Sequence, residues 1–255
     1  MRITGEKNNQ VKFQIKSKKR VNEHGEVFTA EREVKAMCDL VAQECDRIDS
    51  RFLEPACGDG NFLAEILTRK LTTVKKLYKS NPYDFERYSV LAITSLYGVD
   101  IMQDNVTECR ARLFKLWDKE YRSACKKAVS DETREAVKYI LSKNILCGNA
   151  LTLMCVDENQ NDLDMPIIFP EWSLMLGTKL KRRDFRLDVI NLNIDCEGIY
   201  TQKVKDRLNI LKNCFNSYLF GDVTEYKMLT TTLSKNCKTI RTLWMRLCVS
   251  KVSVR

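Results

Sequence analysis

The most informative run of residues in this 255-residue chain is Leu53-Glu54-Pro55-Ala56-Cys57-Gly58-Asp59-Gly60-Asn61-Phe62. A short apolar segment leads into it, Gly58 and Gly60 interrupt the pattern, and an amphipathic pattern begins at Phe62. Glycine lets a backbone approach a ligand closely, and the first turn of a helix offers amide groups that lack intrahelical partners. The run therefore predicts a ligand-binding turn between a strand and a helix, at the carboxyl edge of a parallel sheet.

Apolar residues recur at helical or strand spacing on both sides of this turn. Thr29 can cap the first helix, because its hydroxyl can accept a hydrogen bond from an orphan amide. We expect helices over residues 31–45, 62–71, 105–126 and 131–141, a helical segment over 88–97 leading into a strand that ends at 98–101, and further strands over 49–54, 144–151 and 166–169. Strands that alternate with helices predict an α/β fold with a mostly parallel sheet and helices on both faces.

Charge and composition divide the chain into three parts. We expect a basic N-terminal arm over residues 1–20, a folded domain over 21–190, and a tail over 191–255 whose elements the pattern does not define. The formal net charge is +9, but the tail carries 11 basic and 5 acidic residues, so the body is only mildly basic. Charge alone is therefore weak evidence for a nucleic-acid partner.

The composition also bears on compartment and metals. No apolar run approaches the roughly 20 residues that a membrane span needs, and residues 1–20 have no apolar stretch of signal-peptide type. We expect a cytoplasmic protein without a membrane partner. The 11 cysteines show no Cys-x-x-Cys pair and His24 is the only histidine, so we expect reduced, mostly buried thiols and no metal site.

The run at 53–62 resembles the first motif of amino-methylating DNA methyltransferases, especially the adenine-N6 enzymes of restriction-modification systems. Their usual form is Asp-Pro-Ala-Cys-Gly-Ser-Gly-Asn-Phe; here Glu54 leads the motif and Asp59 replaces the serine. The resemblance implies a Rossmann-like methyltransferase fold that binds S-adenosylmethionine. It assigns contacts with the cofactor to these residues of the run: Glu54, Cys57, Gly58, Gly60 and Phe62.

Residues 24–30, which read HGEVFTA, resemble the family's N-terminal cofactor motif, whose usual end is Phe/Tyr-Thr-Pro. Phe28 and Thr29 inherit cofactor contacts from this resemblance, while Ala30 replaces the proline. An ordinary helix start is the alternative interpretation of this segment.

Residues 98–101, which read GVDI, resemble the end of the family's second strand. The resemblance implies that Asp100 accepts hydrogen bonds from the ribose hydroxyls and that Ile101 packs against the adenine ring. Residues 147–151, which read CGNAL, resemble the family's Gly-Asp-Ala-Leu. Asn149 occupies the position of the acid that, in the family, accepts a hydrogen bond from the adenine amino group of the cofactor. Its amide oxygen can accept the same bond but carries no charge, so we expect weaker cofactor binding than in the family. A buried strand end is the alternative there.

The family's catalytic motif, Asp/Asn/Ser-Pro-Pro-Tyr/Phe, is missing, because none of the four prolines is adjacent to another. We interpret Asn81-Pro82-Tyr83 as a turn, because it precedes the second strand. Glu171 and Trp172 occupy the expected position of the motif and are weak candidates to contact an amine and a base, although a tryptophan packed on the sheet is the simpler account. The catalytic residues are thus unknown.

Several functions stay open. The lead hypothesis is a restriction-modification methyltransferase acting on adenine N6 in DNA, or its cofactor-binding subunit, with a second methyltransferase or specificity subunit as partner. One alternative is a non-catalytic module, such as a truncated remnant, that binds S-adenosylmethionine or a partner. Others are a full enzyme with an unusual catalytic motif, and methylation of RNA or protein by a related fold. The basic run of Lys179, Lys181, Arg182 and Arg183 suits phosphate contacts or a solvated helix face equally.

Overall fold

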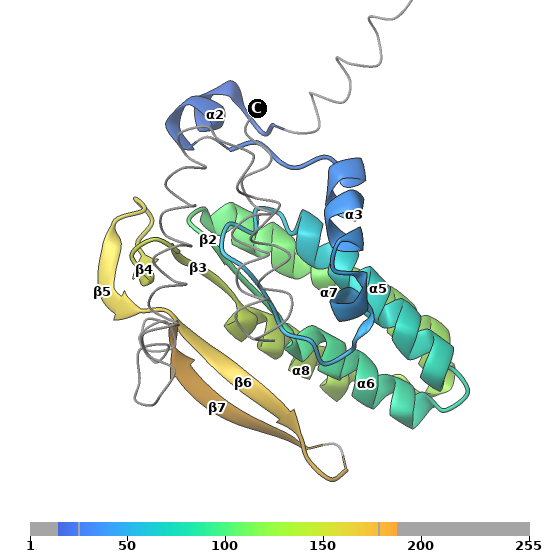
Figure 1. The fold of residues 1–255 in the computed structure, drawn as a ribbon. Coiled ribbons are helices and arrows are strands. Elements are labelled where there is room, and N and C mark those ends of the chain that lie inside the picture. Colours follow the sequence, from blue (N-terminus) through green and yellow to red (C-terminus); the bar gives the residue numbers. More distant parts are fainter. Residues whose placement is uncertain (1–14, 25, 178, 188–255) are drawn as a thin grey trace, which may run out of the picture.

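The computed structural model describes residues 15–24, 26–177 and 179–187 (Figure 1). Most of the arm predicted over 1–20 and the whole tail predicted over 191–255 lie outside these residues. The elements follow in the order α2 Lys18–His24, α3 Glu31–Asp39, α4 Ala42–Asp46, β1 Phe52–Glu54, α5 Asn61–Tyr78, α6 Pro82–Thr94, β2 Leu96–Asp100, α7 Gln103–Cys125, a 3-10 turn Lys126–Ala128, α8 Asp131–Asn144, β3 Ile145–Asn149, β4 Met154–Val156, β5 Asp162–Pro166, β6 Ile168–Leu174 and β7 Leu180–Arg186.

Strands β1 to β5 form one mixed sheet in that order, and β6 and β7 form a separate antiparallel pair. The pairs β1–β2 and β2–β3 are parallel, and helices connect these strands, as the alternating pattern predicted. The pairs β3–β4 and β4–β5 are antiparallel hairpin connections. The α/β class is therefore confirmed, with a sheet that is parallel in the part that holds the predicted ligand-binding turn.

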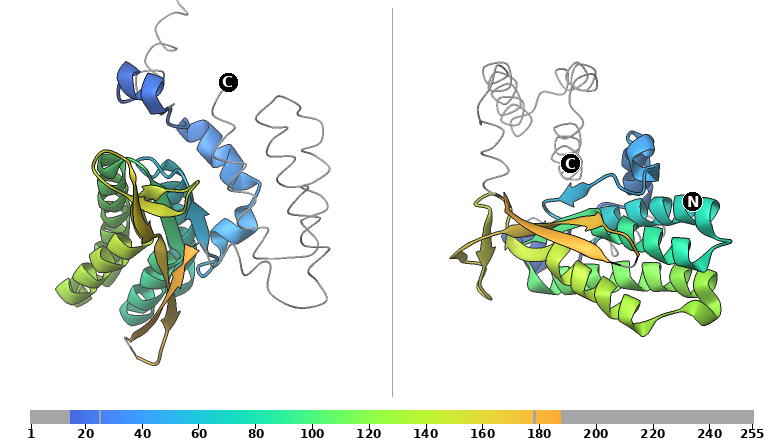
Figure 2. Two further views of the ribbon diagram at one scale, coloured as in Figure 1. Left: turned by 90° about the vertical axis from the view of Figure 1, so that its left-hand side faces the viewer. Right: turned by 90° about the horizontal axis from the view of Figure 1, so that it is seen from below.

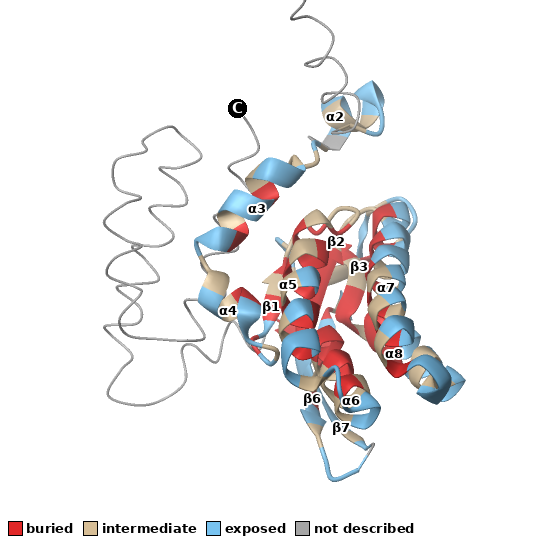
Figure 3. Cartoon of the chain, turned by 90° about the vertical axis from the view of Figure 1, so that its right-hand side faces the viewer, coloured by how far each residue is buried: buried red, intermediate tan, exposed pale blue. Residues whose placement is uncertain are grey.

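Alternate residues of the parallel strands face opposite sides of the sheet. Phe52, Leu96 and Ile145 pack into the main core beneath α5 to α8, which Figure 3 shows lying together over the strands. Tyr97 and Val99 point the other way and form a second core. This second core also contains Ile167, Phe169 and Leu187, with Leu53 and Leu146 packed against it.

The second face of the sheet departs from the prediction of helices on both faces. Within the described residues it carries Ile167 and the start of β6, and the β6–β7 hairpin lies beside the sheet as a separate ribbon (Figure 2). The fourth strand predicted over 166–169 is also wrong. Those residues end β5 and begin β6, and between them the Ile167 amide donates to the Leu153 carbonyl at 2.9 Å, where the chain leaves the sheet.

The helices α6 and α3 differ in whether a side chain caps their first turn. Asn81 caps α6, because its side chain accepts from the amides of Tyr83 and Asp84 while Pro82 occupies the first turn. The interpretation of 81–83 as a turn is thus wrong in detail, because Asn81 is the N-cap and Pro82 and Tyr83 begin α6. The expected cap by Thr29 is wrong: α3 begins after Ala30, which makes no side-chain cap bond, and the helix predicted over 31–45 divides into α3 and α4. None of the helices in the described part of the chain is long and apolar enough to cross a membrane.

Candidate ligand-binding site

The turn after β1 takes a backbone conformation that requires glycine at two positions. Gly58 and Gly60 have φ values of 53° and 91°, in the left-handed region that side chains avoid. Gly60 is the N-cap of α5, and its carbonyl accepts from the Ala64 amide at 2.8 Å. A Cβ atom on Gly60 would lie 2.7 Å from Cys109 Sγ, so α5 begins in close contact with α7. The predicted turn between strand and helix is therefore confirmed.

Asp100, at the carboxyl end of β2, holds this turn in place. Its Oδ2 accepts from the Gly58 amide at 2.8 Å, and its Oδ1 accepts from the Met102 amide at 2.9 Å and from Asn105 Nδ2 at 3.1 Å. Burial raises the pKa of Asp100, and these three hydrogen bonds act in the opposite direction. The carboxylate thus connects the turn after β1 to the start of α7.

The segment before α3 closes over the same turn. A Cβ atom on Gly58 would lie 2.9 Å from Phe28 Cε1, so the ring packs directly on the turn. Asn61 Nδ2 donates to the Thr29 carbonyl at 3.3 Å. Lys16 Nζ lies 5.9 Å from the centre of the Phe28 ring and 3.1 Å from Asp104 Oδ2 on α7. Phe28 and Thr29 therefore contact the turn, and the cofactor contacts expected of them stay a prediction.

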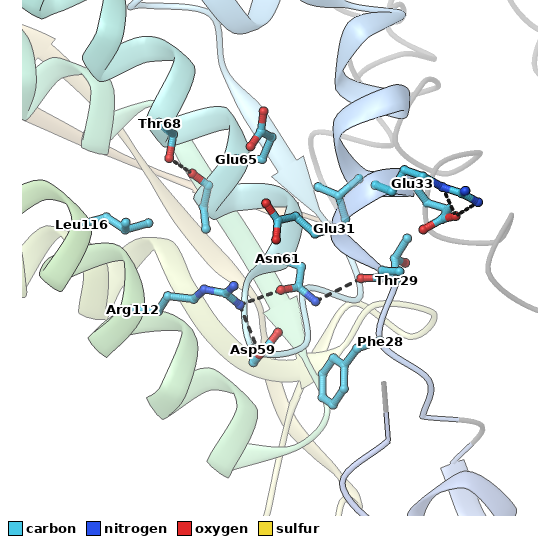
Figure 4. A pocket seen from close by; sticks show the side chains of 14 residues that line it. Phe28, Thr29, Glu31, Glu33, Asp59, Asn61, Glu65, Thr68, Arg112 and Leu116 are labelled. Carbon is cyan, nitrogen blue, oxygen red and sulfur yellow. Dashed lines mark hydrogen bonds and ion pairs between the residues drawn. The ribbon is translucent and has the colours of Figure 1, made fainter. Parts of the chain in front are cut away.

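A cavity of about 840 Å³ opens between α3, the turn and the helices α5 and α7. Asp59 and Asn61 belong to its lining, and Figure 4 shows Arg112 reaching from α7 to both, at 3.1 Å and 2.6 Å. Burial raises the pKa of Asp59, while the charge of Arg112 lowers it. The cavity shares Phe28 and Thr29 with the predicted site, but Asp100, Ile101 and Asn149 are not part of its lining. It therefore lies on the helical side of the turn.

The other residues of the run that have a predicted cofactor contact are buried. Glu54 is 4 % exposed, Cys57 is 6 % exposed and Phe62 is 8 % exposed. The Cys57 amide donates to the Val99 carbonyl at 2.9 Å, and Phe62 belongs to the main core. Cys57 and Phe62 therefore shape the turn from within.

Asn149 ends β3 and is engaged by the hairpin that follows. Its Oδ1 accepts from the Leu151 amide at 3.0 Å, and its Nδ2 donates to Asp162 Oδ1 at 3.1 Å. An amide oxygen can accept a second bond, so the predicted adenine contact has one acceptor position left. Ile101 is half-buried directly after β2, and its carbonyl accepts from Cys147 Sγ on β3. Asp100 and Asn149 are thus the last residues of the neighbouring parallel strands β2 and β3, and Ile101 directly follows β2. All three lie at the carboxyl ends of these strands.

Glu171 and Trp172 lie at the opposite edge. Trp172 is 9 % exposed and its Nε1 donates to Asn144 Oδ1 at 2.8 Å, just before β3 begins. Glu171 forms an ion pair with Arg51, just before β1 begins. Both residues therefore lie near the amino ends of β1 and β3, whereas the ligand-binding turn follows the carboxyl end of β1. Neither residue can contact a ligand at that turn. The simpler account, a tryptophan packed on the sheet, is correct.

Sequence reasoning missed four polar residues around the turn. They are Glu26, Asp59, Asn105 and Arg112. Asn105 Nδ2 donates to Glu26 Oε1 at 2.7 Å as well as to Asp100, so Glu26 before α3 and Asp100 at the end of β2 share a donor on α7. The pattern gave no signal for Asn105 and Arg112 on α7, because polar residues on an amphipathic helix usually face solvent.

The basic run and the cysteines can also be placed. Lys181, Arg182 and Arg183 lie on strand β7, so the expectation of a helix face is wrong. Arg182 lies over Trp172, 5.9 Å from the ring centre, and pairs with Asp184. The buried cysteines in the described part of the chain are Cys38, Cys45, Cys57, Cys109 and Cys125, as expected for small apolar residues. No group of three or more side chains suited to a metal occurs among the described residues.

The attachment of the N-terminal segment makes a prediction about pH. The hydrogen bond from Arg20, followed by that from Lys16, lowers the pKa of Asp104 to about 2. A lowered acid pKa contributes stability that is present above the unfolded value near 3.9 and is lost as the pH falls through about 2. A carbon-detected NMR titration should find the Asp104 carboxyl titrating near pH 2. The difference in unfolding free energy between wild type and Asp104→Asn should shrink over the same range, and a midpoint near 3.9 would contradict the pairing.

No protein-family model matches the sequence, and no curated protein or solved structure is significantly similar to it. The interpretation of this site therefore rests on its geometry and on the sequence motifs alone.

Proposed function

We propose that the chain binds S-adenosylmethionine at the turn after β1 and forms the cofactor-binding part of an adenine-N6 DNA methyltransferase of a restriction-modification system. One observation supports this most directly: the acid at the end of β2 bonds the amide of a left-handed glycine in the turn after β1, at 2.8 Å. In an open α/β sheet this edge is where nucleotide ligands bind. The same residues carry the sequence resemblance.

The side chains at this edge fit a nucleoside with a sulfonium tail. Asp100 offers a carboxylate oxygen to a ribose hydroxyl, Ile101 offers an apolar surface to the adenine, and Asn149 offers one acceptor to its amino group. The absence of a side chain on Gly58 lets the Phe28 ring lie directly against the turn. Bound S-adenosylmethionine supplies an activated methyl group, and the protein's part is to hold that group in line with an amine.

The second candidate is a binding module that does not transfer methyl groups by itself. The position of Glu171 and Trp172 at the far edge of the sheet favours it, since no other residues were candidates for the catalytic loop. Both candidates share the cofactor site. We assign the transfer step to an assembly with a second subunit that brings the catalytic loop and recognises DNA in the cytoplasm.

Photochemical cross-linking tests the site and the transfer step separately. The full chain, irradiated with S-adenosylmethionine labelled at the methyl group, should incorporate label in peptides that contain Phe28 or the turn at 55–60. Asp100→Ala should reduce the incorporated label at least tenfold, because a charge-assisted hydrogen bond to the ligand is lost. Excess S-adenosylhomocysteine should compete. Unchanged labelling of Asp100→Ala would place the ligand elsewhere.

The same labelled cofactor, incubated with adenine-containing DNA and the chain alone, should leave the DNA unlabelled. Label on adenine N6 in the absence of any partner would contradict the assignment of the catalytic loop to a second subunit.

A further inference from the structure

Asp100 has little capacity left for a ligand. An ionised carboxylate has about four acceptor positions, and three are taken by Gly58, Met102 and Asn105. Two of these bonds fill both acceptor positions of Oδ1, so the open position lies on Oδ2, next to the Gly58 amide. A vicinal diol has two hydroxyl groups to donate, and Asp100 alone can accept one of them.

Glu26 offers a second acceptor next to Asp100. Its side chain is 10 % exposed, and Oε1 accepts from Arg20 Nη2 and from Asn105 Nδ2, both at 2.7 Å. Because Asn105 Nδ2 also donates to Asp100, the two carboxylates lie on either side of one amide group. Burial raises the pKa of Asp100, and the negative charge of the nearby Glu26 carboxylate raises it further.

The other oxygen of Glu26 accepts no hydrogen bond from the described residues, although it is buried. The Nε of Arg20, which pairs with Glu26, is likewise buried without a partner in the described part of the chain. A buried polar atom that makes no hydrogen bond costs free energy, so both atoms favour a ligand group that can donate and accept. A hydroxyl group does both.

We propose that Glu26 and Asp100 together bind the ribose diol of the nucleoside, and that each carboxylate accepts a hydrogen bond from one hydroxyl group. This inference rests on the proposed function and extends it, because it makes the N-terminal segment part of the nucleoside site. It also explains why Arg20 and Lys16 fasten that segment to Asp104 at the start of α7. The segment positions the second carboxylate.

The test pairs single variants with single hydroxyl deletions. Calorimetry on the full chain compares S-adenosylhomocysteine with its 2′-deoxy and 3′-deoxy forms, for wild type, Glu26→Gln and Asp100→Asn. Glu26→Gln should weaken binding of S-adenosylhomocysteine on the order of tenfold, because a charge-assisted bond becomes a neutral one. That loss should vanish with one deoxy form, and the loss in Asp100→Asn should vanish with the other.

Glu135→Gln is the matched control. It makes the same change at an exposed carboxylate of α8 that pairs with Lys138 away from this site, and it should change binding of all three ligands by less than about threefold. Circular dichroism checks that each variant is folded.

The outcomes separate the two proposals. If wild type binds none of the ligands, the proposed function fails and this inference with it. If wild type binds and Asp100→Asn shows its hydroxyl-specific loss, but Glu26→Gln is neutral or weakens all three ligands equally, then only the inference is overturned. In that case Glu26 supports the fold or holds a water molecule.

Discussion

Replacing Lys70 by methionine is expected to lower the free energy of unfolding by about 3–5 kcal/mol, although the side chains have similar length. Lys70 lies in the middle of α5 and is 0 % exposed. Its Nζ donates to the carbonyls of Arg47, Ile48 and Ser50 at 2.7, 3.0 and 2.7 Å. An ammonium group has three hydrogens to donate, and methionine has none.

The substitution therefore leaves three carbonyls of the segment before β1 without this donor. The ammonium also lies 5.2 Å from the centre of the Phe52 ring, so a cation–π contact with the first residue of β1 is lost as well. Because β1 leads directly into the ligand-binding turn, Lys70 fixes the position of that turn from the helix behind it.

Lys75→Met on the same helix is the control. Lys75 is half exposed and pairs with Glu120 at 2.9 Å, and an exposed ion pair contributes less than about 1 kcal/mol. Urea unfolding followed by circular dichroism measures both variants. Equal midpoints for Lys70→Met and Lys75→Met would show that the buried ammonium does not stabilise the fold.

Gly60→Ala is expected to destabilise the chain by about 2–5 kcal/mol. Two costs combine at this position: the left-handed φ of 91°, and a Cβ atom 2.7 Å from the buried Sγ of Cys109. Cys109 is 0 % exposed in the core, so its Sγ has little room to move away, whereas its Cα, at 3.5 Å from the added atom, would lie at an ordinary contact distance.

Gly177→Ala separates the two costs. Gly177 also has a positive φ, of 73°, but a Cβ atom there would meet nothing within 4 Å. We expect a loss of about 1 kcal/mol from backbone strain alone. Thermal or urea unfolding of both variants gives the packing contribution by difference, and equal losses would contradict the close approach of α5 to α7.

The periodic elements of the fold could be predicted from the sequence because burial determines them. The helices over 105–126 and 131–141 match α7 and α8, because one apolar face of each packs into the main core. The turn at 58–60 could be predicted because left-handed backbone selects glycine. Each of these signals is local.

The errors arose where a partner distant in the sequence decides the structure. Pro166 and Phe169 are consistent with one buried strand, but the bond from Ile167 to Leu153 divides them between two sheets. The β4–β5 hairpin was not predicted, and Asp162 in it accepts a hydrogen bond from the amide of Asn149. Glu26 and Asn105 could not be related to Asp100, because their contact depends on how the N-terminal segment folds back on α7.

Calorimetry of S-adenosylmethionine with the full chain, alongside Gly58→Asp, tests the central claim most directly. The substitution brings a side chain within 2.9 Å of the Phe28 ring and a second negative charge next to Asp100. We expect saturable binding to wild type and none to a Gly58→Asp variant that keeps its circular dichroism spectrum. A well-folded wild type that does not bind, or equal binding by both proteins, would contradict a cofactor site at this turn.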